Sequence, residues 1–290
     1  MKWQGRRRSS NVEDRRSSGS SGGGGRGLAM GGGGLGLIIM IVLVLMGGGN
    51  LGDVLGNITG GGGGGGPQAP YVETEQDKEL MEFVEVVLAD TEDVWGEVFR
   101  KNGMQYKKPT LVVFSGTVQS ACGMAGAATG PFYCPPDEKL YIDLSFYNDL
   151  SRKYGAPGDF AMAYVVAHEV GHHVQNLLGI TDQMQELRQK VSEKEYNKLS
   201  VKLELQADYL AGVWAHYEAD LGRLDEGDIQ EALDAASAVG DDRLQKQATG
   251  RVTPDSFTHG TSEQRMEWFY KGYKLGTLDG GDTFNDKSLR

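Results

Sequence analysis

Two histidines four residues apart, with a glutamate directly after the first, occur in the stretch AHEVGHHVQN, residues 167–176. On a helix, residues i and i+4 share a face, so His168 and His172 can direct two imidazoles at one metal ion. Glu169 lies about 100° round the helix from His168, where it can act on a water molecule as a general base. This spacing predicts a zinc site that hydrolyses peptide bonds. The alternative is a core helix whose histidines bind no metal.

Two histidines leave such a site incomplete, because a catalytic zinc ion takes three protein ligands and keeps one position open. Gln175 and Leu178 stand where a metzincin has its glycine and its third histidine. The better candidate is ELQAD, in which Glu204 and Asp208 are again four residues apart on an expected helix. Glu204 is predicted to complete the ligand set, and Asp208 to accept the outer N–H of a ligand histidine.

The other three histidines carry different expectations. His173 points about 100° away from His172 and is expected to be a polar surface or helix-end residue. His216 lies more than three turns beyond Glu204 on the expected helix and should be too far from the metal. His259, just before another expected helix, is predicted to donate a hydrogen bond to the oxyanion of the reaction. A structural histidine in a turn is the alternative for His259.

The elements that must position these residues are read from the spacing of hydrophobic residues. Helices are expected over residues 74–101, 160–178, 182–198, 201–218, 226–239 and 262–275. Strands are expected over residues 110–118 and 140–147. The second strand is predicted to be the edge against which a peptide pairs, with Asp143 on it influencing specificity. A helix, then strands, then a block of helices indicates an α+β domain.

Charge is unevenly placed along the 290 residues. Residues 1–30 hold seven Lys and Arg against two Asp and Glu, and residues 31–66 add only Asp53. Since the whole chain carries −11, residues 67–290 must carry −15. So acidic a domain repels phosphate backbones, and we expect no nucleic-acid partner.

The apolar run LGLIIMIVLVLM occupies residues 35–46, and it extends back to residue 28 without a charge. A helix of that length, about 28 Å, can span a bilayer. Six arginines precede it, and the positive-inside tendency keeps them in the cytoplasm. The sequence therefore predicts a basic cytoplasmic tail (1–27), a single transmembrane helix (28–46), a disordered Gly-rich linker (47–70) and an extracytoplasmic domain (71–290) at the inner membrane. A cleaved signal peptide and an inverted topology are the alternatives.

Cys122 and Cys134 are the two cysteines of the chain. Because an extracytoplasmic compartment permits disulfides, we expect the pair to close a short loop. Two unpaired thiols are the alternative.

Several motifs together resemble the bacterial neutral zinc metallopeptidase family over essentially the whole chain: HEVGHH, ELQAD, GPFYCPPDEKLYIDLSF and GDDRLQ…FTHGTSEQR. NVEDRR, near the start, resembles that family's leader. The resemblance implies a helix-rich, zincin-like fold with a small sheet packed on the H-E-x-x-H helix. It also implies one Zn²⁺ ion held by His168, His172 and Glu204, with Glu169 as the base.

The pattern H-E-x-x-H with E-x-x-x-D is also similar to that of gluzincins, more distantly. THGTSEQR resembles a segment of membrane CAAX-type proteases, which have proline where this chain has Gly260. That likeness suggests roles at the site for His259 and Arg265.

The sequence as a whole predicts a membrane-anchored zinc endopeptidase acting on proteins or peptides. The alternative is a non-catalytic, membrane-tethered module that keeps the zincin shape to bind peptides or to organise envelope proteins. An intact Glu169 argues against that module, because a binder needs no base. Another divalent ion is the alternative to zinc, because affinity order alone does not choose the metal.

Overall fold

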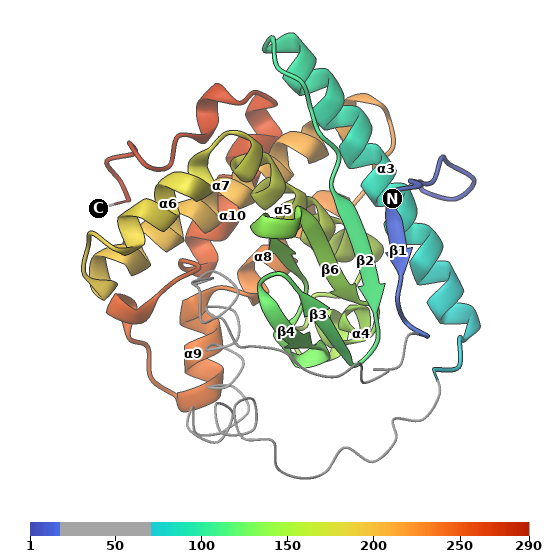
Figure 1. Ribbon diagram of the computed structural model, residues 1–290, viewed down its shortest axis with the longest axis horizontal. Coiled ribbons are helices and arrows are strands. Elements are labelled where there is room, and N and C mark those ends of the chain that lie inside the picture. Colours follow the sequence, from blue (N-terminus) through green and yellow to red (C-terminus); the bar gives the residue numbers. More distant parts are fainter. Residues whose placement is uncertain (18–70, 290) are drawn as a thin grey trace.

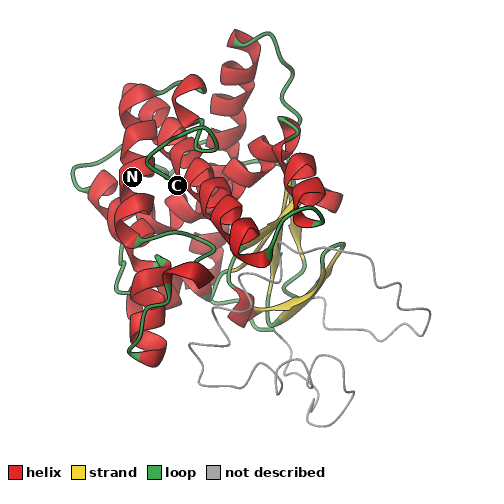
Figure 2. Cartoon of the chain, turned by 90° about the vertical axis from the view of Figure 1, so that its left-hand side faces the viewer, coloured by secondary structure: helices red, strands yellow, loops and turns green. Residues whose placement is uncertain are grey.

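The computed structural model describes residues 1–17 and 71–289. The expected transmembrane helix at 28–46 and linker at 47–70 lie outside these residues. Within the described ranges, no helix is both long enough and apolar enough to cross a bilayer. The expected α+β class is confirmed: many helices pack beside a small sheet (Figure 2).

Four strands form a mixed sheet in the order β1–β2–β6–β5, and a separate hairpin joins β3 to β4 (Figure 1). In chain order the strands are β1 (Val12–Asp14), β2 (Thr110–Phe114), β3 (Thr117–Ser120), β4 (Gly123–Gly126), β5 (Phe132–Cys134) and β6 (Lys139–Asp143). β1, β2 and β6 run parallel, and β5 runs antiparallel to β6. The sheet therefore has β5 at one edge and β1 at the other.

The strand predictions were partly wrong. Residues 110–118 are not one strand, because a turn with Gly116 at a φ of 78° separates β2 from β3. Residues 140–147 are a strand only as far as Asp143, because helix α4 begins at Phe146. That strand, β6, is not the edge, because it pairs with β2 on one side and β5 on the other. Its residues 140–143 are all buried. Alternating hydrophobicity shows that a strand is covered but does not show which strands flank it.

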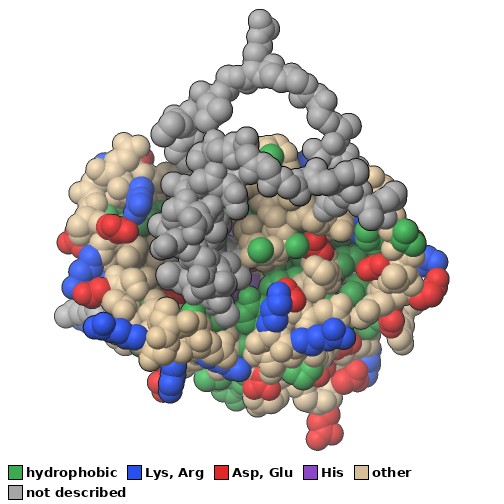
Figure 3. Space-filling view, turned by 90° about the horizontal axis from the view of Figure 1, so that it is seen from below, with side chains coloured by type: hydrophobic (Ala, Val, Ile, Leu, Met, Phe, Trp, Pro, Cys, Tyr) green, Lys and Arg blue, Asp and Glu red, His purple; other side chains and the backbone are tan. Residues whose placement is uncertain are grey.

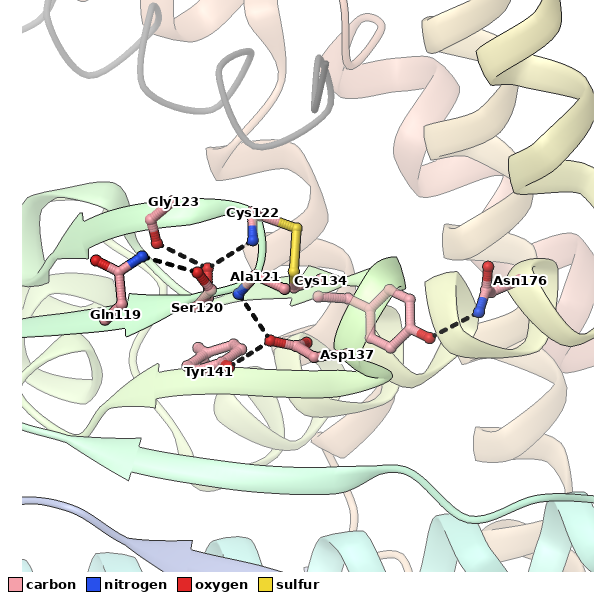
Figure 4. Close-up of a disulfide and its surroundings, with 10 residues drawn as sticks. Gln119, Ser120, Ala121, Cys122, Gly123, Cys134, Asp137, Tyr141 and Asn176 are labelled. Carbon is pink, nitrogen blue, oxygen red and sulfur yellow. Dashed lines mark hydrogen bonds between the residues drawn. A yellow bond between two sulfur atoms is a disulfide. The ribbon is translucent and has the colours of Figure 1, made fainter. Parts of the chain in front are cut away.

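Both faces of the sheet are covered. The side chains of Leu111, Val113, Leu140 and Ile142 join the main core. That core lies against two helices, α3 (Glu75–Lys101) and α5 (Asp159–Leu177). The alternate residues form a smaller core under the β3–β4 hairpin. The disulfide between Cys122 and Cys134 ties the turn of that hairpin to the end of β5 (Figure 4).

The remaining helices are α4 (Phe146–Arg152), α6 (Ile180–Arg188), α7 (Glu193–Asp220), α8 (Asp228–Ala238), α9 (Asp241–Thr249) and α10 (Ser262–Leu275). The expected division at residues 199–200 was wrong. The break lies at residues 189–192, because Ser192 caps α7 in a reciprocal capping box with Glu195. Helix α9 was not expected, since it is short and largely polar.

Glycines let the helices that carry the site approach backbone to backbone. A Cβ added to Gly171 of α5 would lie 2.9 Å from the carbonyl oxygen of Ala207 on α7. A Cβ on Gly212 of α7 would lie 2.0 Å from the carbonyl oxygen of Phe269 on α10. Gly171 lies inside the H-E-x-x-H motif itself, so the small residue between the histidines sets how closely α7 can deliver its carboxylates.

Residues 1–16, expected to form a tail separate from the domain, pack against it instead. Strand β1 lies beside β2 and pairs with it (Figure 1). Trp3 packs edge-on against Phe83 of α3. The folded unit therefore includes residues 1–16 as well as residues 71–289. The basic composition of residues 1–16 suggested a tail. The carboxylates that pair with these residues lie far away in the sequence, so no local pattern revealed the pairing. On the face in Figure 3, basic and acidic side chains are interspersed rather than segregated.

Candidate metal centre

The three predicted ligands meet between α5 and α7. His168 Nε2 lies 3.2 Å from one oxygen of Glu204, and His172 Nε2 lies 3.4 Å from the other. One ligand atom from each residue falls within 4.8 Å of the other two. His168 and His172 lie one helical turn apart on α5, and Glu204 and Asp208 lie one turn apart on α7, as the spacing predicted. The two nitrogens and the carboxylate are the donor set of a His₂Glu zinc site.

The outer nitrogens of both histidines are occupied. His168 Nδ1 lies 2.8 Å from Asp208 Oδ1, and His172 Nδ1 lies 2.8 Å from Gln175 Oε1. Both partners are acceptors, so both Nδ1 atoms carry a proton and each Nε2 faces Glu204. A positive charge between these atoms, either a proton on Nε2 or a metal ion, offsets the charge of the carboxylate. Two Nε2 atoms and a carboxylate, with the outer ring nitrogens already bonded, are ligands that zinc takes, so the residues fit a bound Zn²⁺ ion.

Gln175 was missed by the sequence analysis as a site residue. Its amide nitrogen donates to the carbonyl oxygen of Leu203, at 2.7 Å, and to Gln206 Oε1, at 3.1 Å. These two bonds leave the amide oxygen facing His172. The only signal for Gln175 in the sequence was its position three residues after the ligand His172.

Asp208 lies at the centre of a buried network. Its side chain is fully buried and accepts hydrogen bonds from His168, from the hydroxyl of Tyr164 and from two nitrogens of Arg265, at 2.8 and 2.9 Å. Burial opposes the ionised carboxylate, but Arg265 and His168 outweigh burial and lower the pKa of Asp208 to about 2. Burial also opposes protonation of His168, yet Asp208 raises the pKa of that imidazole to about 9. The network holds the His168 ring in one orientation.

Glu169 follows His168 on α5 and lines a cavity of about 120 Å³ next to the three ligands. Its residue surface is only 7% exposed. Burial raises the pKa of its carboxyl, although both ligand histidines and the backbone of Tyr133 act in the opposite direction. A carboxylate with a raised pKa beside a metal site suits proton transfer near neutral pH.

His259 also lines this cavity and is held by Asp241, a residue that the sequence analysis did not single out. Asp241 Oδ2 accepts the backbone N–H groups of residues 258, 259 and 260, at 2.6 to 3.0 Å. Its other oxygen lies 3.3 Å from His259 Nδ1. Burial lowers the pKa of His259, but the nearby charges of Asp241 and Glu204 raise it overall. The motif GDDRLQ contains Asp241, but no local spacing connects it to a loop eighteen residues away.

His173 and His216 lie outside the candidate metal site, as expected, but the environment of His173 differs from the expected one. His173 is fully buried, so its expected surface position was wrong. Its Nε2 donates to the carbonyl oxygen of Lys107, at 2.6 Å, and its Nδ1 lies 2.9 Å from the Tyr133 hydroxyl. These two contacts connect His173 of α5 to β5 and to the loop before β2. His216 Nδ1 donates to the carbonyl oxygen of Tyr273, at 2.8 Å.

The rest of the cavity wall is mostly apolar. Beyond the site residues already named, it is lined by Thr129, Gly130, Pro131, Phe146, Tyr154, Val165, Val239 and Leu244. Residues 129–131 lead directly into the edge strand β5. Asp143 does not line the cavity, and its oxygens accept the N–H groups of Gly116 and Ser145. Its suggested influence on specificity therefore lacks a structural basis.

A second acidic cluster consists of Asp159, Asp228 and Glu231. The amino group of Met1 lies 2.8 Å from Asp159 and 3.3 Å from Asp228. The cluster already has a cation from the chain itself.

The comparison with known families agrees with this geometry. A family model described as "Putative neutral zinc metallopeptidase" matches residues 1–284. The chain belongs to this family. The predicted resemblance is thus confirmed, and family membership supports zinc as the metal for the group formed by His168, His172 and Glu204.

Relatives in this family include "Uncharacterized protein YpfJ" of Escherichia coli (strain K12). It is 50% identical over 284 residues, which are 98% of this chain and 99% of that protein. "Uncharacterized protein Mb2605" of Mycobacterium bovis is 45% identical over 195 residues, 63% of this chain and 65% of that protein. No solved structure matches the chain.

Proposed function

We propose that this protein is a zinc-dependent endopeptidase with a zincin-like site. The observation that carries the proposal is the convergence of His168, His172 and Glu204, with buried Glu169 at the wall of the adjoining cavity. A pure metal-binding or structural site would need the three ligands but not the fourth carboxylate. Membership of a zinc metallopeptidase family agrees with this function.

A zinc ion held by these ligands would lower the pKa of water toward neutrality and polarise a peptide carbonyl. Glu169 then takes the proton of the attacking water and passes it to the leaving amine. Burial supports this role because it raises the pKa of the carboxyl, so the residue can both accept and return a proton.

His259, which lines the same cavity, would bind the carbonyl oxygen of the peptide as negative charge develops on it. Asp241 holds Nδ1 and the backbone of the loop, so the imidazole is fixed, and no described residue hydrogen-bonds its Nε2. Asp241 and Glu204 both favour a protonated ring, which can donate a hydrogen bond from Nε2. A donor fixed before the reaction stabilises the charge without reorganisation.

The substrate is best accommodated as an extended peptide along β5. This strand ends the sheet within the described residues, and the segment leading into it, residues 129–131, lines the cavity. An added strand at such an edge gains backbone hydrogen bonds. The apolar walls formed by Phe146, Val165 and Leu244 favour a bulky apolar side chain next to the scissile bond.

The decisive experiment compares the zinc-loaded full chain with the Glu169→Gln variant on an unfolded protein substrate. We expect Glu169→Gln to lose at least about 100-fold in cleavage rate, because the general base is gone. Elemental analysis should still find one zinc per chain, because Glu169 is not a ligand. Glu186→Gln, an exposed glutamate of α6, is the matched control and should cleave like the unaltered chain. Wild-type turnover by Glu169→Gln, or the absence of cleavage by the zinc-loaded chain, would overturn the proposal.

A further inference from the structure

The N-terminal arm, defined here as residues 1–16, is an integral part of the folded domain. It lies along α3 and then adds β1 to the sheet in parallel with β2. Trp3 is only 9% exposed and its ring centre lies 5.5 Å from that of Phe83. The family model also begins at residue 1, so the arm belongs to what the family shares. Contacts of this kind require the arm and the domain to fold in one compartment.

The arginines of the arm are counter-ions for carboxylates of the domain. Arg6 pairs with Asp90 of α3 and lies 3.6 Å from Glu218 of α7. Arg7 pairs with Glu92, at 3.3 Å, and those three carboxylate side chains are at most 4% exposed. Buried carboxylates need such partners, because an uncompensated buried charge is strongly destabilising. Two of the arginines that resemble a cytoplasmic topology signal, Arg6 and Arg7, are therefore paired with buried carboxylates of the domain.

The two ends of the undescribed segment meet at one place on the domain. Arg16, which is 7% exposed, donates to the hydroxyl of Tyr71, at 3.0 Å, and pairs with Glu73, at 2.9 Å. Its guanidinium also lies 5.3 Å from the centre of the Tyr71 ring. Arg16 therefore lies beside Tyr71 and Glu73, where the description of the chain resumes.

We propose that residues 1–16 and residues 71–289 occupy the same side of any membrane that this protein contacts, so the chain is not anchored by a single crossing. One crossing between Arg16 and Tyr71 would put the arm and the domain on opposite sides and break every contact described above. This shared side replaces the topology predicted from the arginine-rich start.

The topology is tested by labelling single introduced cysteines in cells with a membrane-impermeant maleimide. Arg8→Cys reports on the arm and Lys190→Cys on the domain, since both side chains are more than half exposed, at 54% and 64%. The unaltered chain, whose Cys122 and Cys134 are joined, gives the background. Both sites should label together, or both should be protected until the cells are lysed. Labelling of one site and protection of the other would overturn the proposal.

A second experiment tests whether the arm is docked in the full chain within cells. Arg6→Gln removes one of two arginines that pair with buried Asp90 and Glu218, the other being Arg223. Arg8→Gln removes only contacts of 3.5 Å or more to less buried carboxylates. We expect the thermal midpoint in whole cells to fall for Arg6→Gln and to change little for Arg8→Gln. Unchanged midpoints for both variants would show that the arm is not docked and would also overturn the proposal. Neither experiment reads peptide cleavage, so their failure is separate from failure of the proposed activity.

Discussion

Replacing Asp208 by asparagine tests how the protein holds its first metal ligand. The substitution keeps the size of the side chain and one oxygen for the His168 ring, but it removes the negative charge. Asp208 is fully buried, and its principal charged partner, Arg265, is 4% exposed. Removing one member of a buried pair costs about 3–5 kcal/mol, because the remaining charge is left without a partner. In a domain of this size that corresponds to a fall of roughly 6–20 °C in the thermal midpoint.

The same substitution should weaken zinc binding. The carboxylate fixes which nitrogen of His168 carries the proton and raises the basicity of the other. Loss of such a partner weakens metal affinity by about 10- to 100-fold. Calorimetry of the metal-free protein measures the first effect, and competition for zinc with a chromogenic chelator measures the second.

Asp220→Asn is the matched control for Asp208→Asn. Asp220 lies on the same helix, its side chain is 69% exposed, and it approaches only His216, at 3.5 Å. We expect it to change neither the thermal midpoint nor the zinc affinity. Should Asp208→Asn lower the midpoint and yet bind zinc within twofold of the unaltered chain, the claim that Asp208 orients the ligand would be wrong. If Asp208→Asn does not fold, Tyr164→Phe, which removes one hydrogen bond to Asp208, gives a milder test.

Three further predictions concern packing, charge and the oxyanion donor. Gly212→Ala should lower the free energy of unfolding by about 1–3 kcal/mol or more, because its Cβ would lie 2.0 Å from a backbone oxygen. Gly96→Ala, whose Cβ meets nothing within 4 Å, should leave that free energy unchanged or raise it by up to about 1 kcal/mol. Urea unfolding compares the two variants. Burial raises the pKa of Asp90 to about 7. The folded state therefore binds the extra proton between about pH 4 and 7, and stability falls as pH rises through that window. Between pH 5 and pH 8 the thermal midpoint of Asp90→Asn should therefore rise relative to that of the unaltered chain. A fall relative to the unaltered chain would contradict the raised pKa of Asp90. His259→Ala should lower kcat about 100-fold with zinc affinity nearly unchanged, and Asp241→Asn should act in the same direction; a loss confined to KM would exclude the oxyanion role.

The sequence by itself determined the features that depend on residues close together in the chain. His168, Glu169 and His172 share one helical turn, and a second pair, Glu204 and Asp208, repeats that spacing. Helical geometry fixes the relative direction of such residues wherever the helix lies, so their separate faces could be predicted before the fold was known. The α+β class followed in the same way, from the order of helical and strand periods along the chain.

Only the tertiary structure decided which distant residues meet. No local pattern connects Asp241 with His259, or the arginines of residues 1–16 with carboxylates of α3 and α7, because those contacts depend on how whole helices pack. The edge of the sheet was misplaced for the same reason, since hydrophobic alternation reports burial and not the identity of the neighbouring strand. An arginine-rich start looks the same in sequence whether it faces a cytoplasm or a set of buried carboxylates, and the free energy of pairing buried charges in the folded domain distinguishes the two.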